Sequence, residues 1–253
     1  MKSVLEVRDL TKQFVKDDLG IVALRDLSLE IEEGRFVTVL GRSGCGKSTM
    51  LNMMSGLMAP TSGVVRFRDE PVTGPRTEVG YLTQSDTLMP WRDVRRNVEM
   101  PMEIKGVEAK ERRERAADLI ERVGLTGFGR HYPRELSGGM RRRASLARML
   151  AGGPEVLLLD EPFGALDAQL RFELQAELLR LWQGSGQTVV FVTHDIEEAL
   201  LLGDRIVVLG RIGRVVLDKA IDLPRPRDAD ELRVDPHFVA LHKEMADALR
   251  ETR

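Results

Sequence analysis

The order of apolar and polar residues predicts a series of β-strands in the first 85 positions. The segment LRDLSLEI alternates the two residue types, as a half-exposed strand does, whereas FVTVL is apolar throughout, as a buried strand is. Gly and Pro residues separate the segments and favour turns between them. The runs VLEVR, VVRF and VGYL predict further strands in the same region.

The pattern changes between Trp91 and Ala151, where strand-like runs are absent. Within KGVEAKERRERAADLIERVGL, the apolar residues recur at helical spacing on an otherwise charged segment; they are Ala116, Leu119, Ile120 and Val123. This spacing predicts an amphipathic helix. We therefore expect a helical subdomain at residues 86–155, inserted between two strand-rich parts of the chain.

Strand and helix signals alternate after this insertion. The runs VLLLD, TVVFVT and RIVVLG predict buried strands, and LDAQLRFELQAELLRLWQ, between the first two, carries leucines at helical spacing. A strand, a helix and another strand in succession predict a parallel sheet with right-handed crossovers. We expect one α/β domain over residues 1–253, with its core at 1–85 and 156–224 and a partly helical tail at 225–253.

Composition and charge limit the classes of function that the chain can have. The chain has 38 Lys and Arg residues against 40 Asp and Glu residues, so its overall charge gives no reason to expect nucleic-acid binding. The start, MKSVLEVRDL, has no apolar signal-peptide core, and secretion is not expected. No apolar run reaches the roughly 18 residues that a membrane-spanning helix needs. The single cysteine, Cys45, fits a reducing compartment.

A glycine-rich loop follows FVTVL and precedes the apolar-periodic segment MLNMMSGLM. Strand, loop and helix in this order are the context in which the pattern G-x-x-x-x-G-K-[ST] binds phosphate. Backbone N–H groups would surround the phosphate oxygens, Lys47 would reach the β- and γ-phosphates, and the Ser48 hydroxyl would ligate Mg²⁺. The residues expected to contact the nucleotide here are Gly41, Arg42, Ser43, Gly44, Cys45, Gly46, Lys47, Ser48 and Thr49.

Cys45 lies inside this loop, at the start of a predicted helix. A helix N-terminus favours the thiolate, so we expect a reactive thiol whose alkylation blocks nucleotide entry.

Charged residues end two of the predicted strands. Asp160 is suited to hold the Mg²⁺ shell, and Glu161 can act as general base toward the attacking water. His194 follows TVVFVT at the carboxyl edge of the sheet, where α/β proteins bind ligands, and we expect it to contact the γ-phosphate.

The segment ELSGGMRRR, residues 135–143, offers backbone donors and positive charge without a base or a nucleophile. It is therefore suited to hold an anion. The arginine triplet 141–143 is interpreted as a mixture of positive potential toward phosphate and a solvated helix face.

Taken together, these elements resemble the nucleotide-binding subunit of ABC transporters over most of the chain. The resemblance implies a P-loop NTPase core with a mostly parallel sheet, an antiparallel β subdomain and an inserted α-helical subdomain. The elements that carry it are, in chain order, Phe14, the phosphate loop 41–49, Gln84 in YLTQSD, LSGGM at 136–140, VLLLDEP, GALD at 164–167, and His194.

The resemblance also implies roles for matching residues and a homodimer that encloses two ATP molecules. Residues Ser137, Gly138, Gly139 and Met140 would bind the γ-phosphate of ATP held by the other subunit, although Met140 and Arg142 stand where many members have Gln.

Other matched residues keep an alternative structural role. Phe14 would stack on adenine, or else belong to the core. Gln84 would touch Mg²⁺, take part in catalysis with Lys47, Glu161 and His194, and sense a membrane partner, or else be a polar strand end. Asp167 would order the dimer interface, or else be a helix N-cap.

A narrower resemblance concerns importers of nitrate, taurine and alkanesulfonates. It rests on TLMPWRDVRRNVEMP, EPFGALDAQLR, VTHDIEEALLLGDRI and PVTGP, while RIGR at 211–214 lacks the Pro-Gly pair frequent in that subgroup. It implies an ATPase with ATP and Mg²⁺ as cofactors, at the cytoplasmic face of the cell membrane. Its partners would be an integral-membrane permease and, indirectly, a periplasmic or extracellular solute-binding protein.

Two other functions are alternatives to this one. A soluble ATPase of the same fold, acting as an assembly factor without a permease, stays open at this point. A P-loop kinase would need a phosphoryl acceptor site and would have no use for LSGGM.

Overall fold

The computed structural model describes residues 2–16, 19–164 and 166–252. They form two compact units, which are described separately. The first unit is Met1–Arg76 with Gly186–Arg253, and the second is Thr77–Ser185. Ala165 of the GALD element lies outside the described residues.

The first unit contains an antiparallel sheet in the order β2-β1-β4-β5. Its strands are β1 (Ser3–Lys16), β2 (Leu19–Glu32), β4 (Ser62–Phe67) and β5 (Glu70–Pro71). Leu24 and Leu27 lie three positions apart, which in a regular strand would put them on opposite faces. Both are buried, because a register shift and the positive φ of 50° at Asp26 turn them to one face. The alternation in LRDLSLEI thus builds an antiparallel sheet with one buried face.

The same unit holds β3 (Phe36–Gly41), β8 (Thr188–Thr193), β9 (Arg205–Leu209) and β10 (Val215–Ala220). Strand β3 lies between β8 and β9 and is parallel to both, which agrees with the continuously apolar runs in the sequence. Strand β10, which the sequence pattern did not predict, pairs antiparallel with β9.

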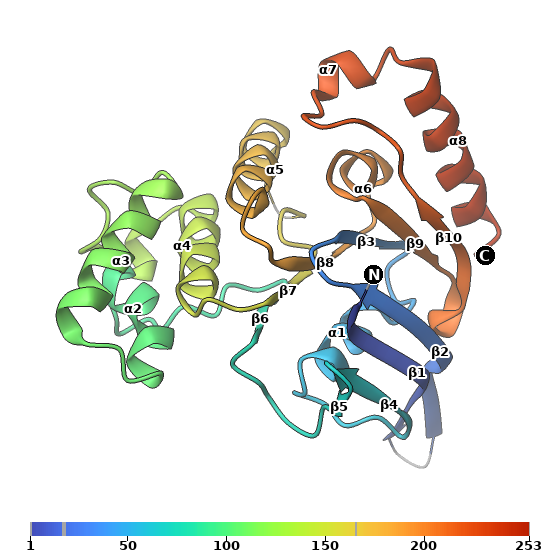
Figure 1. Cartoon of the computed structure of the whole chain (residues 1–253), viewed down its shortest axis with the longest axis horizontal. Helices are drawn as coiled ribbons and strands as arrows, with labels where there is room; N and C mark the ends of the chain where they lie inside the picture. The colour runs from blue at the N-terminus through green and yellow to red at the C-terminus, as the bar shows by residue number, and fades with distance from the viewer. Residues whose placement is uncertain (1, 17–18, 165, 253) are drawn as a thin grey trace. The chain divides into compact units, whose positions relative to one another are not determined.

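Helices complete this unit. These are α1 (Lys47–Met54), α6 (Ile196–Leu202), α7 (Ala229–Leu232), α8 (Pro236–Arg250) and the short 3₁₀ turn η2 (Arg211–Gly213). Helix α8 runs beside β10 in Figure 1 and packs Leu241 and Met245 into a cluster with Leu40 and Val208. The amphipathic helix predicted in the tail is therefore present.

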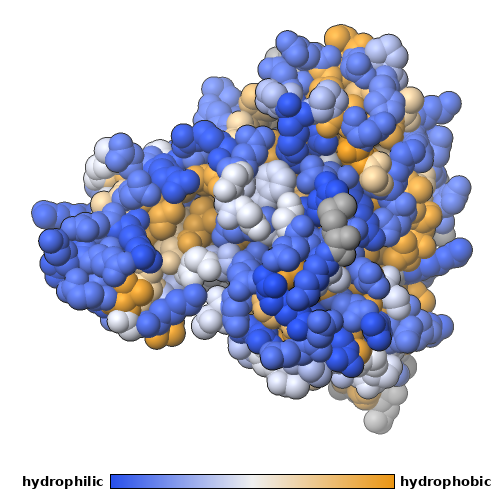
Figure 2. Space-filling model, viewed as in Figure 1, coloured by the Kyte–Doolittle hydropathy of each residue, from blue (hydrophilic) through white to orange (hydrophobic). Residues whose placement is uncertain are grey.

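The second unit pairs β6 (Val79–Leu82) in parallel with β7 (Val156–Asp160). Its helices, coloured green to yellow in Figure 1, are α2 (Val94–Ile104), α3 (Ala109–Arg122), α4 (Gly138–Ala151) and α5 (Ala168–Trp182), with the 3₁₀ turn η1 (Pro133–Glu135). Helix α3 buries only Ala116 and Ile120, and the surface over it is mostly hydrophilic in Figure 2. This confirms the amphipathic helix predicted from its spacing.

Parallel strands, an antiparallel sheet and a group of helices all occur where the sequence predicted them, and the predicted P-loop NTPase fold class is confirmed. In the described part of the chain, no helix combines the length and apolarity that a membrane crossing requires.

Candidate nucleotide site

The glycine-rich loop connects β3 to α1 in the first unit. Gly44 and Gly46 have φ values of 81° and 106°, a backbone conformation that favours glycine and curls the loop. Helix α1 has no acidic residue in its first turn, and no described side chain caps its N-terminus. By contrast, α2, α5 and α8 each begin with an aspartate cap. No described side chain therefore occupies the N-terminus of α1, a position that fits a bound phosphate.

Lys47 is folded into the loop. Only 4% of the residue is exposed, and its Nζ donates to the carbonyl oxygens of Gly41 at 2.8 Å and Arg42 at 3.0 Å. A buried ammonium that donates to loop carbonyls is a positive charge placed within the loop, as phosphate binding requires.

Neighbouring residues support the loop tightly. A Cβ at Gly41 would lie 2.8 Å from Cys45 Sγ, and a Cβ at Gly46 would lie 2.5 Å from Leu24 Cδ2. The Gly213 N–H donates to the Cys45 carbonyl at 2.9 Å. Side chains at Gly41 or Gly46 would thus displace atoms that hold the loop in shape.

Cys45 is only 6% exposed. Burial limits the access of reagents to this thiol in the folded chain, and its reactivity toward alkylation stays a prediction. A cavity of about 440 Å³ lies beside the loop, lined by Val22, Arg42, Ser43, Gly44, Cys45, Gly210, Arg211, Ile212 and Thr252.

His194 lies at the same edge of the sheet as the loop. Strand β8 pairs with β3 in a register that sets Thr193 opposite Leu40, so His194 and the loop leave adjacent strands at their carboxyl ends. His194 and Ser48 are exposed, while Thr49 is half-buried. Within this unit the structure brings His194 and the glycine-rich loop to one edge.

Phe14 belongs to β1, where it pairs with Ile21. Its exposed fraction is 37%, so it is not a core residue. The Lys12 ammonium lies 5.3 Å from the centroid of its ring. The ring face therefore accepts a cation and is accessible for stacking.

The second unit brings Gln84, Asp160 and Glu161 to one edge of its parallel strand pair. Leu82 lies opposite Leu159 in the register, so Gln84 and Asp160 leave the strands on the same side. Asp160 is 4% exposed, whereas Gln84 is exposed.

Tyr81 orients the buried carboxylate of Asp160. Its hydroxyl donates to Asp160 Oδ2 at 3.4 Å. Burial, followed by the charge of Asp160, raises the pKa of Tyr81 above its ordinary value, so the hydroxyl stays protonated and remains a donor. Sequence reasoning missed Tyr81, since nothing near it in the chain indicates this contact.

Glu161 adopts a φ of 42°, in the left-handed region that non-glycine residues rarely enter. The Gly164 N–H donates to the Glu161 carbonyl at 3.3 Å and closes a turn immediately after β7. Backbone of this kind persists only where the surrounding structure holds it, which marks the turn as a candidate functional position.

Ser137 is the N-cap of α4, and its Oγ accepts from the Met140 N–H at 3.3 Å. Ser137 and Gly138 are exposed, Met140 is half-buried, and Gly139 is buried. A Cβ at Gly139 would lie 2.3 Å from Leu170 Cδ2 on α5, so glycine permits this close approach.

Asp167 is the N-cap of α5 and accepts from the Leu170 N–H at 2.9 Å. The structural alternative considered for this residue is therefore present. Its carboxylate is exposed.

The interpretation of the arginine triplet is wrong for Arg142. Arg141 forms an ion pair with Asp86 at 2.8 Å, and Arg143 donates to the carbonyls of Val123 and Gly124, but Arg142 is buried and turned inward. Three consecutive helical residues point in directions about 100° apart, and only packing decides which is covered. The one available signal was that Arg142 occupies a position where Gln is frequent.

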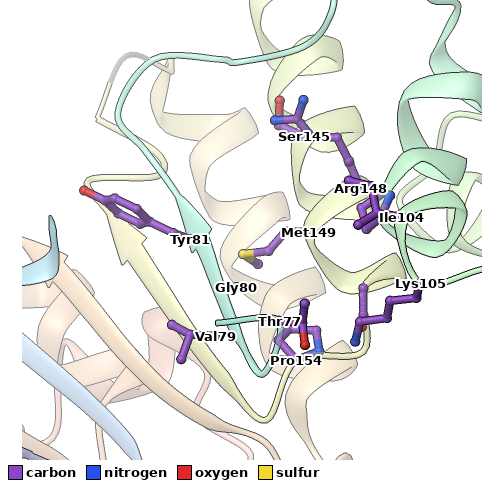
Figure 3. A pocket seen from close by; sticks show the side chains of 12 residues that line it. Thr77, Val79, Gly80, Tyr81, Ile104, Lys105, Ser145, Arg148, Met149 and Pro154 are labelled. Carbon is purple, nitrogen blue, oxygen red and sulfur yellow. The ribbon is translucent and has the colours of Figure 1, made fainter. Parts of the chain in front are cut away.

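A separate pocket of about 200 Å³ lies in this unit, between β6 and the ends of α2 and α4. Figure 3 shows Met149 and Pro154 close to Gly80, whose Cβ would lie 2.9 Å from an atom of each. None of the residues predicted to bind the nucleotide or Mg²⁺ lines this pocket.

No group of three or more His, Cys, Asp or Glu side chains in the described ranges could enclose a metal ion. Magnesium needs no such cage, since it usually binds one or two carboxylates together with substrate phosphates and waters. The buried, oriented carboxylate of Asp160 fits this requirement.

Comparison with known proteins agrees with this geometry. Residues 24–164 match the ABC transporter family, and the chain belongs to that family and is an ATPase. The taurine import ATP-binding protein TauB of Yersinia pestis is 42% identical over 239 residues, covering 92% of this chain and 94% of TauB. The nitrate import ATP-binding protein NrtD of Synechocystis is 40% identical over 252 residues, covering 97% and 95%.

A solved structure shows the same fold. It is a dimeric ATP-binding cassette in a post-hydrolysis state with ADP and Pi, with a TM-score of 0.79 and 33% identity over 87% of this chain and 100% of that chain.

Proposed function

We propose that this chain is the ATP-hydrolysing subunit of a bacterial ABC importer. It dimerises around two ATP molecules and drives uptake of a small anion such as nitrate, taurine or an alkanesulfonate. The uncapped N-terminus of α1, with Lys47 folded into the preceding loop, is the observation that carries the ATP-binding part. The likeness to TauB and NrtD along nearly the whole chain supports the importer part.

The loop residues and Lys47 hold the phosphates, and Phe14 offers an exposed ring to adenine. Asp160, Ser48 and Gln84 supply oxygens for Mg²⁺, which neutralises phosphate charge when bound. Glu161 accepts the proton of the attacking water, and His194 contacts the γ-phosphate. The division into a core at 1–85 and 156–224, a helical subdomain at 86–155 and a tail at 225–253 stays a prediction.

The dimer is proposed on the chemistry of Ser137. Its Oγ already accepts from Met140 N–H, and a hydroxyl can accept and donate at once, so its proton remains available for a phosphate oxygen. Gly138 beside it is exposed and leaves the helix N-terminus open to an anion carried by the second subunit. Asp167 stands exposed at the start of α5 and would face the same interface.

The partner is an integral-membrane permease, and the subunit associates with it at the cytoplasmic face of the cell membrane. A periplasmic or extracellular solute-binding protein takes part indirectly. The transported solute does not contact this chain, so its identity has to come from these partners.

The test is affinity purification of the full chain from detergent-solubilised membranes, followed by mass spectrometry and a Mg²⁺-dependent ATPase assay. A permease should copurify, and Lys47→Ala should abolish ATP turnover. The alternative function, a soluble assembly factor, would give ATP turnover without any membrane protein. Wild-type protein that neither binds nor hydrolyses ATP would refute both.

A further inference from the structure

Arg142 makes a set of hydrogen bonds that the proposed roles do not use. Arg142 is 6% exposed and lies on α4, the helix that Ser137 caps. Its Nε donates to the Pro162 carbonyl at 2.6 Å. Its Nη1 donates to the Thr83 carbonyl and, at 3.4 Å, to the Gln84 carbonyl.

These acceptors flank the two candidate catalytic residues of the second unit. One carbonyl belongs to Gln84 itself, and another belongs to Pro162, which directly follows Glu161. The φ of 42° at Glu161 needs support from its surroundings, and the bond to Pro162 provides it on one side. A single side chain therefore holds the backbone at both positions.

The positive charge of the Arg142 guanidinium is costly in its buried position. Burial lowers the pKa of Arg142 to about 10, against the favourable charges of Asp160 and Asp86, and Nη2 has no hydrogen-bond partner among the described residues. The side chain still carries its charge at neutral pH. A planar guanidinium has five donors in a rigid arrangement, so it can reach carbonyls on two separate segments, which neither Lys nor Gln can match.

We propose that Arg142 is a positioning residue for ATP hydrolysis, which joins the helix carrying Ser137 to the backbone at Gln84 and beside Glu161. The inference rests on the function proposed above. A displacement of α4, whose N-terminus would meet the γ-phosphate, then changes the placement of Gln84 and of Glu161 together.

The test compares Arg142→Met and Arg142→Lys with the matched control Arg143→Met. Arg143 lies next to Arg142 on α4 and also donates to two carbonyls, but those belong to Val123 and Gly124, away from the candidate catalytic residues. Steady-state ATP hydrolysis, nucleotide binding and melting temperature are measured on the same full-length preparations.

Arg142→Met removes every donor of the side chain and should lower kcat by roughly ten- to a hundredfold, as misplacement of reacting groups does, while the KM for ATP changes less than about twofold. Arg142→Lys should recover only a small part of kcat, because an ammonium keeps the charge but cannot span the carbonyls. Arg143→Met should keep kcat within about twofold of wild type.

A kcat of Arg142→Met equal to that of wild type would overturn the inference, and so would an equal fall in Arg143→Met. Full recovery in Arg142→Lys would also overturn it, since charge alone would then suffice. Should Arg142→Met not fold, Arg142→Lys decides, because a loss of kcat at unchanged KM is expected of it as well. Wild-type protein without ATP turnover would refute the proposed function itself, whereas wild-type turnover that the variants retain refutes only the role of Arg142.

Discussion

The Tyr81 hydroxyl donates to Asp160 Oδ2 at 3.4 Å, so the tyrosine orients the carboxylate proposed to hold Mg²⁺. Tyr81→Phe removes this bond and leaves the ring in place. We expect the Mg²⁺ concentration for half-maximal ATPase activity to rise about threefold, a small effect for a ligand-orienting residue because the bond is long. A Mg²⁺ titration of activity at saturating ATP measures it.

The other tyrosine of the chain provides the control. Tyr132 lies in the same unit but is exposed, and Tyr132→Phe should leave the Mg²⁺ titration unchanged. If both variants and wild type gave the same Mg²⁺ titration curve, Tyr81 would have no part in orienting Asp160 for Mg²⁺ binding.

Glu161→Gln should retain ATP but lose turnover. The amide cannot accept a proton from water, while the glycine-rich loop and Lys47 lie elsewhere and remain intact. We expect hydrolysis to fall at least a hundredfold, within the range for loss of a general base, and an ATP-bound dimer to accumulate. Size-exclusion chromatography with labelled ATP detects it; hydrolysis within twofold of wild type would exclude Glu161 as the base.

Ser137→Arg should fill the anion site at the start of α4 without altering the loop around Lys47. ATP binding to the subunit should persist, and hydrolysis should fall on the order of a hundredfold, as loss of a preorganised charge-stabilising contact does. The measurements are nucleotide binding and ATPase activity on one preparation.

Mixing Ser137→Arg with Lys47→Ala tests whether Ser137 acts on ATP held by the other subunit. In the mixed dimer, one of the two sites combines an intact glycine-rich loop with an intact Ser137 from the partner. With Glu161→Gln added to both chains, we expect ATP-dependent dimer in the mixture above either variant alone. Both variants must be folded, and Ser137→Arg must bind ATP. If the mixture then forms no more ATP-dependent dimer than either variant alone, Ser137 does not bind the γ-phosphate of ATP held by the other subunit.

Gly139→Ala should destabilise the second unit through contact with α5. The added Cβ would lie 2.3 Å from Leu170 Cδ2. We expect a loss of about 1 kcal/mol, at the lower end for overpacking, because the methyl that must move ends a flexible side chain. Urea unfolding measures it.

Two variants check this explanation. At Gly138 the added Cβ would meet only Arg141 Nη2, at 3.9 Å, so Gly138→Ala should cost much less. Leu170→Ala combined with Gly139→Ala should cost less than the sum of the single changes. Strict additivity would show that Leu170 is not the cause.

The glycine-rich loop could be predicted from sequence because its conformation depends on neighbours in the chain. A buried strand, glycines that accept the positive φ values of 81° and 106°, and a following helix are all local properties. The buried strands β3, β7 and β8 and the helix α3 were likewise readable from periodicity. Strand β10 was not, since it pairs at an edge with a half-exposed, mixed sequence.

Tertiary structure alone decided which side chain contacts Asp160 and which residue of the arginine triplet is buried. Tyr81 meets Asp160 because β6 and β7 pair in parallel, a long-range contact that no pattern near either residue records. Arg141, Arg142 and Arg143 are alike in sequence, and their different environments follow from the rotation of α4 against the turns after β6 and β7. Sequence determines which chemical groups are present and the local backbone they favour, whereas packing determines which of them meet and which are removed from water.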